Sequence, residues 1–172
     1  MKLPFRYLLT AVAATAALAA CSSNKPKPTP PPPPQEQTAS TGPAHNGPYS
    51  GPEALDTDSC LRQRVIYFDL DKTEIHPEFE AQIACHAAYL REFPGAKVKL
   101  EGNTDERGTR DYNQGLGERR GNAVQSAIAA AGASTSQLDV VSYGEEKPVC
   151  REHNEGCWHK NRRVEIVYTS KQ

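Results

Sequence analysis

A proline-rich segment, residues 22–58, limits where this chain can fold. It reads SSNKPKPTPPPPPQEQTASTGPAHNGPYSGPEALDTD and offers almost no apolar side chains, so burial cannot offset the conformational entropy lost on folding. Its proline block favours a stiff, extended conformation. We therefore predict a disordered spacer here and one folded domain over residues 59–172, an ordinary domain length. A docking site for a proline-binding module is the alternative interpretation of this segment.

The first residues have the layout of an export signal. Lys2 and Arg6 precede an alanine-rich apolar run from Leu8 to Ala20, too short and wrongly flanked for a membrane span. The sequence LAA directly before Cys21 resembles a lipobox, where a peptidase cleaves before a cysteine that carries lipid. We predict a signal peptide over residues 1–20 and a mature chain whose lipidated Cys21 is anchored by acyl chains. An ordinary signal peptide with an incidental cysteine is the alternative.

Hydrophobic spacing in residues 59–172 switches between the periods of strands and helices. Alternating or β-branched runs predict strands at residues 64–69, 97–102, 138–144 and 163–169. Apolar residues at helical spacing predict helices at 76–95 and 110–131, the second capped by Thr109 and ended by Gly132. This order predicts an α/β sandwich in which helices pack on one side of a small mixed sheet.

Several functional classes find no support in the sequence. It has no glycine-rich phosphate loop, HExxH helix or nucleophile elbow. A net charge of −1 and a pI near 6.5 argue against nucleic-acid binding through a broad basic surface. These residues therefore leave an enzyme unsupported rather than excluded, and we expect no cofactor and no nucleic-acid partner.

Four cysteines follow Cys21, an even number in a chain with an export signal, which favours disulfides. Four cysteines permit three pairings, and from locality we predict Cys150 with Cys157 and Cys60 with Cys85. The alternative is a zinc site, because four possible ligands fall within ten residues: Cys150, His153, Cys157 and His159. Their spacing differs from that of common zinc modules, so we expect no metal.

Opposed charges flank the start of the second predicted helix. Asp105 follows the 97–102 strand, where its carboxylate would be solvated, and Arg120 lies well inside the helix. Asn113 and Arg120 are seven residues apart and share a face, while Leu116 suits the packed side. An anion facing a cation across a shallow groove suits a zwitterionic ligand. The alternative is an Asp105–Arg120 ion pair that only fixes the loop to the helix.

Four motifs resemble the OmpA C-terminal-like family, and in particular its lipoproteins that associate with peptidoglycan. They are YFDLDKTEI, EGNTDERGTRDYNQGLGERRGNAV, VVSYGEEKP and NRRVEIVY, in this order behind the lipobox. The resemblance implies an OmpA-like domain that binds the peptide stem of peptidoglycan noncovalently at the free end of meso-diaminopimelate, and hence a binding module rather than an enzyme. A wall-remodelling enzyme that uses such a domain for targeting is the alternative.

The resemblance also implies roles for individual residues. Asp105 would bind the ligand ammonium and Arg120 its carboxylate. Backbone groups at Phe68 and Asp69 would contact the ligand, with Asn113 and Leu116 at or beside the pocket. The sequence departs from the family at Asn103, usually His, and at Gly121, often Ala, and the segment PVCREHNEGCWHK carries two cysteines that many relatives lack.

Location and partners are likewise implied by resemblance. Ser22, judged by lipoprotein sorting signals, implies an outer-membrane anchor with the domain facing the periplasm. The family implies partnership with the Tol system, including its periplasmic β-propeller protein, on a surface that overlaps the peptidoglycan site. Such a protein would tether the outer membrane to the cell wall and support envelope integrity and cell division.

Overall fold

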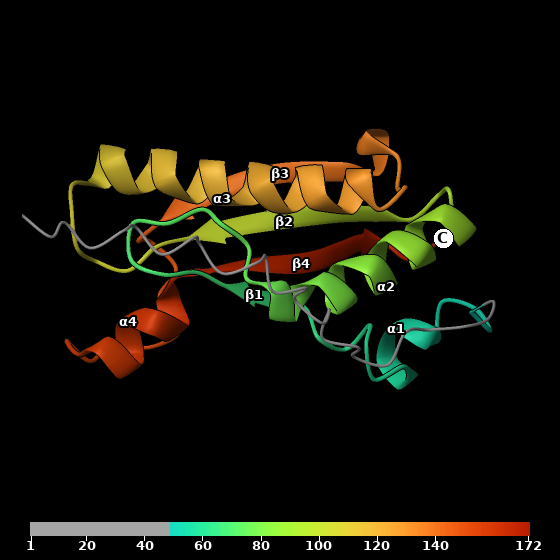
Figure 1. Cartoon of the computed structure of the whole chain (residues 1–172), viewed down its shortest axis with the longest axis horizontal. Helices are drawn as coiled ribbons and strands as arrows, with labels where there is room; N and C mark the ends of the chain where they lie inside the picture. Colours follow the sequence, from blue (N-terminus) through green and yellow to red (C-terminus); the bar gives the residue numbers. More distant parts are fainter. Residues whose placement is uncertain (1–48) are drawn as a thin grey trace, which may run out of the picture. The chain divides into compact units, whose positions relative to one another are not determined.

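Residues 49–172 are described by a computed structural model, in which one four-stranded sheet organises the fold (Figure 1). The strands, in spatial order, are β1 (Val65–Tyr67), β4 (Arg163–Ser170), β2 (Lys97–Asn103) and β3 (Leu138–Gly144). The central strands β4 and β2 pair antiparallel, as do β1 and β4, whereas β2 and β3 pair parallel. The predicted mixed sheet is confirmed.

Two long helices lie side by side along the sheet (Figure 1). They are α2 (Glu80–Glu92), preceded by the 3-10 turn η1 (Pro77–Phe79), and α3 (Arg110–Ala130). Thr109 caps α3 by accepting a hydrogen bond from the Tyr112 amide, as predicted. Three short elements complete the described part of the chain: α1 (Ala54–Thr57), η2 (Thr135–Gln137) and α4 (Glu155–Asn161). None of the helices within residues 49–172 has the length and apolarity to cross a membrane.

The core forms where one face of the sheet meets the apolar faces of these helices. Alternate residues of the strands are buried, because successive side chains of a strand point to opposite faces; they include Ile66, Val98, Leu100, Val164 and Ile166. The helices contribute Ile83, Ala87 and Leu90 from α2, and Val124 and Ile128 from α3. The helical and strand periods read from the sequence therefore identify the two surfaces that pack together.

Residues before Ser59 belong to the packed structure, unlike the sequence expectation. Tyr49 is 6% exposed and Leu55 fully buried. The Tyr49 hydroxyl donates to the Cys85 carbonyl oxygen at 3.2 Å, and its ring packs edge-on against Tyr89. Two apolar side chains in a polar segment are too few to form a sequence pattern, so the folded region starts earlier than expected. The predicted signal peptide, Cys21 and the linker up to residue 48 lie outside the described residues.

Disulfides join Cys60 to Cys85 and Cys150 to Cys157, the two pairings favoured from locality. The second closes a loop over residues 150–157 that includes the start of α4, which was not expected as a helix. Asn154 caps α4 by accepting from the Cys157 amide at 3.0 Å. At its other end, the Asn161 side chain bonds the backbone of Cys150 in both directions. The segment is thereby held firmly next to the start of β4.

Candidate ligand-binding site

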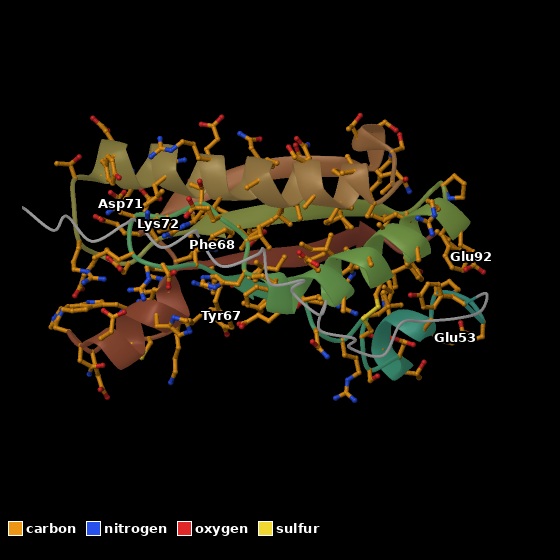
Figure 2. The ribbon with its side chains drawn as sticks, viewed as in Figure 1. Glu53, Tyr67, Phe68, Asp71, Lys72 and Glu92 are labelled. Atoms are coloured by element: carbon orange, nitrogen blue, oxygen red, sulfur yellow. A yellow bond between two sulfur atoms is a disulfide. The ribbon has the colours of Figure 1, made fainter. Side chains whose placement is uncertain are left out.

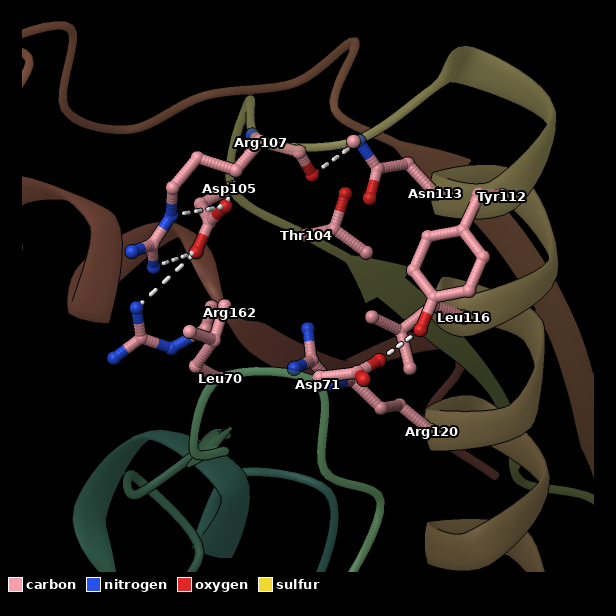
Figure 3. A pocket seen from close by; sticks show the side chains of 11 residues that line it. Leu70, Asp71, Thr104, Asp105, Arg107, Tyr112, Asn113, Leu116, Arg120 and Arg162 are labelled. Atoms are coloured by element: carbon pink, nitrogen blue, oxygen red, sulfur yellow. Dashed lines mark hydrogen bonds and ion pairs between the residues drawn. The ribbon is translucent and has the colours of Figure 1, made fainter.

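A cavity of about 310 Å³ lies between the loop after β1, the turn after β2 and the first half of α3 (Figure 3). Four residues predicted from the sequence line it: Asp105, Asn113, Leu116 and Arg120. The remaining lining residues are Leu70, Asp71, Thr104, Arg107, Gly108, Tyr112 and Arg162. The structure thus brings together side chains that come from segments far apart in the sequence.

The Asp105 carboxylate is buried, only 3% exposed, rather than solvated as expected. Its Oδ1 accepts from the backbone amide of Arg107 at 3.0 Å and from Arg107 Nε at 3.1 Å. Its Oδ2 accepts from Arg107 Nη2 at 2.7 Å and from Arg162 Nη1 at 3.1 Å. A buried carboxylate needs such partners, and here two arginines supply them.

These arginines also determine how Asp105 titrates. Burial by itself raises the pKa of Asp105, but hydrogen bonds from Arg107 and Arg162 outweigh it and leave the pKa below its usual value. Ionised Asp105 therefore stabilises the native state above its unfolded pKa of about 4. That contribution is lost as the pH falls from there through the lowered folded pKa.

Arg120 is fully buried beneath the cavity. Its Nε donates to the Lys72 carbonyl at 2.9 Å, Nη1 to the Asn103 carbonyl at 3.0 Å and Nη2 to the Asp69 carbonyl at 2.9 Å. The guanidinium also lies over the Phe68 ring, 5.2 Å from its centroid. Arg120 thus ties α3 to the loop after β1 and to the end of β2.

The charge of Arg120 persists despite this burial. Burial first, and then the nearby charge of Arg162, lower the pKa of Arg120 to about 10. The side chain therefore remains a cation at neutral pH. Among the described residues, the cations that pair with Asp105 are Arg107 and Arg162, so neither an exposed Arg120 nor an Asp105–Arg120 ion pair is seen.

Phe68 and Asp69, expected to offer backbone groups to a ligand, do not line the cavity. Figure 2 labels Phe68, Asp71 and Lys72, which lie on the loop after β1. The Phe68 carbonyl accepts from Arg162 Nε at 3.0 Å, and its amide donates to the Arg162 carbonyl. The Asp69 carbonyl accepts from Arg120. These backbone groups hold the two buried arginines, while the next residues of the loop reach the cavity wall.

Neutral groups complete the wall. Asn113, 1% exposed, donates from Nδ2 to the Arg107 carbonyl at 3.1 Å and to the Glu145 carboxylate, which ties α3 to two loops. Leu116 supplies an apolar surface. Thr104 is 3% exposed, and its Oγ1 has no hydrogen-bond partner within the described part of the chain. A buried hydroxyl without a partner at a cavity wall is available to a ligand.

Sequence reasoning missed Arg107 and Arg162 as members of the site. Arg107 was not named as a site residue, although its spacing of two residues from Asp105 allows contact. Arg162 lies 57 residues beyond Asp105 and is quoted in the NRRVEIVY motif. The motif identified the segment. No local pattern shows that its first arginine, Arg162, contacts the carboxylate of Asp105, which follows a different strand.

The zinc alternative does not fit the structure. Cys150 and Cys157 are joined in a disulfide and offer no thiolate. His153 instead contacts Glu106 Oε1, to which Trp158 Nε1 also donates at 2.8 Å. No cluster of three or more possible metal ligands occurs in residues 49–172.

Comparison with protein families gives a match to the OmpA family over residues 67–162. A peptidoglycan-associated lipoprotein of Haemophilus influenzae is 47% identical over 111 residues, which cover 64% of this chain and 72% of the relative. The protein of the same name from Pseudomonas aeruginosa is 44% identical over 124 residues, covering 72% of each chain.

Solved structures agree with this match. The crystal structure of the peptidoglycan-associated lipoprotein from Burkholderia pseudomallei superposes with a TM-score of 0.65 at 41% identity, covering 67% of this chain and 98% of that one. The C-terminal domain of Helicobacter pylori MotB gives a TM-score of 0.57 at 22% identity and covers 62% of this chain and 84% of that one. The second likeness concerns the fold alone.

Proposed function

This chain belongs to the OmpA family, with peptidoglycan-associated lipoproteins among its relatives, and on this premise we propose that it tethers the outer membrane to the cell wall. It would do so by binding the diaminopimelate of the peptidoglycan stem noncovalently in the cavity next to Asp105 and Arg120. The relatives' names describe wall association rather than a chemical reaction, and they confirm the prediction that the chain is not an enzyme.

The observation that carries this proposal is that a buried carboxylate and a buried guanidinium line one small cavity. The free end of diaminopimelate bears an ammonium and a carboxylate on one carbon, and opposed charges in one cavity suit both. Arg120 bonds three carbonyls, and a guanidinium has five N–H donors. Two donors therefore remain for the ligand carboxylate, while Asp105 would take the ammonium.

Neutral hydrogen bonds would orient the ligand. Thr104 offers an unpartnered hydroxyl, and Asn113 also lines the cavity. Leu116 would contact the aliphatic part of the diaminopimelate side chain. We assign Phe68 and Asp69 to hold the arginines in place, because their carbonyl oxygens already accept hydrogen bonds from Arg162 and Arg120.

We expect Asp105→Ala to bind peptidoglycan about tenfold more weakly or worse, because a charged hydrogen bond contributes about 1.5 to 3 kcal/mol. Binding would be measured by titrating a synthetic peptide that ends in meso-diaminopimelate. Asp139→Ala removes an exposed carboxylate elsewhere on the domain and serves as the matched control.

Asp105→Ala also leaves two arginines without their shared anion, so a loss of stability must be separated from a loss of contact. A ligand whose terminal amine is acetylated makes this distinction. It lacks the ammonium, so the parent and Asp105→Ala should bind it with similar affinity. Equal binding of the unmodified peptide by both proteins would refute the assignment. Muropeptides released from intact peptidoglycan would favour the wall-remodelling enzyme instead.

The anchor and the location remain proposals that rest on the LAAC motif and on Ser22. The protein would be held in the outer membrane through lipidated Cys21, with its domain in the periplasm at the end of the proline-rich spacer. We expect Cys21→Ser to lose all labelling by a radioactive fatty acid and to remain uncleaved. Labelling equal to that of the parent would contradict a lipid anchor.

A partnership with the Tol system, and through it a role in cell division, is also proposed. Large apolar side chains border the cavity: Leu70 is 52% exposed and Tyr112 is 44% exposed. A protein such as the periplasmic β-propeller of that system would cover them and so exclude the wall. Adding the β-propeller protein to a peptidoglycan pull-down measures this competition, and undiminished wall binding at saturation would exclude an overlapping surface.

A further inference from the structure

All hydrogen-bonding positions on the Asp105 carboxylate are occupied. An ionised carboxylate offers about four lone-pair positions. Arg107 fills three of them, through its backbone amide, Nε and Nη2, and Arg162 fills the fourth. A ligand ammonium can therefore bind Asp105 only if one of these donors leaves.

Arg162 is the less mobile of the two side chains. It is 4% exposed, and besides Asp105 it donates to the Phe68 carbonyl at 3.0 Å and to Glu155. Displacing Arg162 would leave a buried charge and a buried carbonyl group without partners, which would cost free energy. Arg162 therefore stays on Asp105 when a ligand enters.

The Arg107 side chain has an alternative position available. Its side chain is 32% exposed, and its Nη2 already lies 3.6 Å from Glu155 Oε2. Its guanidinium also lies over the Trp158 ring, 4.2 Å from the centroid. A small rotation away from Asp105 would keep the charge between this carboxylate and this ring, both on α4, so that the existing cation–π contact and a closer ion pair offset part of the lost contacts.

We propose that Arg107 is a displaceable counter-ion that makes the site selective for ligands bearing an ammonium group. The ligand ammonium takes the positions that Arg107 Nε and Nη2 hold on Asp105, and Arg107 moves onto Glu155 and Trp158. A neutral group is a poorer replacement for the guanidinium, because it would leave the buried carboxylate with one cation, Arg162, in place of two. This inference rests on the proposed binding of diaminopimelate and adds the residue that controls it.

Helix α4, which begins inside the loop closed by the Cys150–Cys157 disulfide, gains a role from this arrangement. Glu155 and Trp158 belong to α4, which the Cys150–Cys157 disulfide and the Asn154 cap hold in place. They supply the alternative position for Arg107, so the segment would set the affinity for the wall without touching the ligand. The affinity for the ligand ammonium is reduced by the free energy that the displaced contact between Arg107 and Asp105 contributed.

The test compares Arg107→Gln with the parent, using the same meso-diaminopimelate peptide and its amine-acetylated form. We expect Arg107→Gln to bind the unmodified peptide about threefold to tenfold more tightly, because the competitor for Asp105 is absent. The acetylated peptide should show no such gain. Arg110→Gln removes an equal charge from a side chain 77% exposed that pairs with Glu146, and it controls for the general loss of positive charge.

Fluorescence gives a second readout that does not depend on affinity. The chain contains one tryptophan, Trp158, so its emission reports directly on the nearby guanidinium. We expect the unmodified peptide, at saturation, to change this emission in the parent but not in Arg107→Gln. The acetylated peptide should leave it unchanged in both proteins.

Two results would overturn the inference while leaving the proposed function intact. One is weaker or equal binding of the unmodified peptide by Arg107→Gln, which would make Arg107 a ligand contact or a bystander. The other is an emission from Trp158 that stays constant while the parent saturates. If instead the parent does not bind the peptide at all, the proposed function itself fails.

Discussion

Arg120→Met is expected to lower the free energy of unfolding by about 3 to 5 kcal/mol, because three carbonyl groups lose hydrogen bonds from a charged donor. Methionine fills a similar volume but donates no hydrogen bond. The carbonyls of Lys72, Asn103 and Asp69 would all lose the donor that Arg120 supplies to each. Each buried carbonyl left without a donor costs about 1 to 3 kcal/mol. Urea denaturation measures the change.

Arg119→Met is the matched control, because Arg119 is the neighbouring arginine of the same helix and is exposed. An exposed substitution of this kind usually changes stability by less than about 0.5 kcal/mol. If the two variants unfold alike, Arg120 does not hold the loop as its contacts indicate. Because Arg120 holds the loop as well as lining the cavity, ligand binding by the variant must be measured per folded molecule.

Gly102→Ala should destabilise the protein by about 3 kcal/mol or more, at the upper end of what overpacking costs. A Cβ atom on Gly102 would overlap the backbone carbonyl oxygen of Gly117 in α3. Backbone cannot rotate aside as a side chain can, so α3 would have to move away from β2. Thermal denaturation of the variant and the parent would show the loss.

Gly115→Ala provides the control, with an expected effect on stability of the opposite sign. Its Cβ would meet only the tip of the Arg119 side chain, at 3.2 Å, which is flexible and can move. Alanine is favoured over glycine inside a helix by roughly 0.5 to 1 kcal/mol. We therefore expect Gly115→Ala to be as stable as the parent or more so. A Gly102→Ala variant that behaved the same way would show that α3 and β2 tolerate a wider separation.

The close approach of α3 to β2 links stability to the binding site. Arg120 lies on the same helix as Gly117 and donates to Asn103, the residue after Gly102. Asp105 follows two residues later, in the turn that leaves β2. A shift of α3 would therefore change the separation of the two charges that we propose for the ligand, and Gly102→Ala should weaken peptide binding as well.

Local patterns in the sequence were enough to identify the strands, the two long helices and the disulfide pairings. The reason is that side-chain period and turn chemistry depend on neighbours in the chain. Val98 and Leu100 alternate with charged residues and do form a half-buried strand. The position of Asp105, Asn113 and Arg120 around one site also followed from spacing and from the family motif.

The burial and the ion pairing of those residues were decided only by the tertiary structure. Arg120 is buried because Gly102 lets α3 lie against the sheet, and Asp105 is buried because Arg162 reaches it from 57 residues away. Tyr49 joins the core through contacts with α2 that no local pattern announces. Burial and ion pairing depend on which segments meet in space, and a chain's local order does not contain that information.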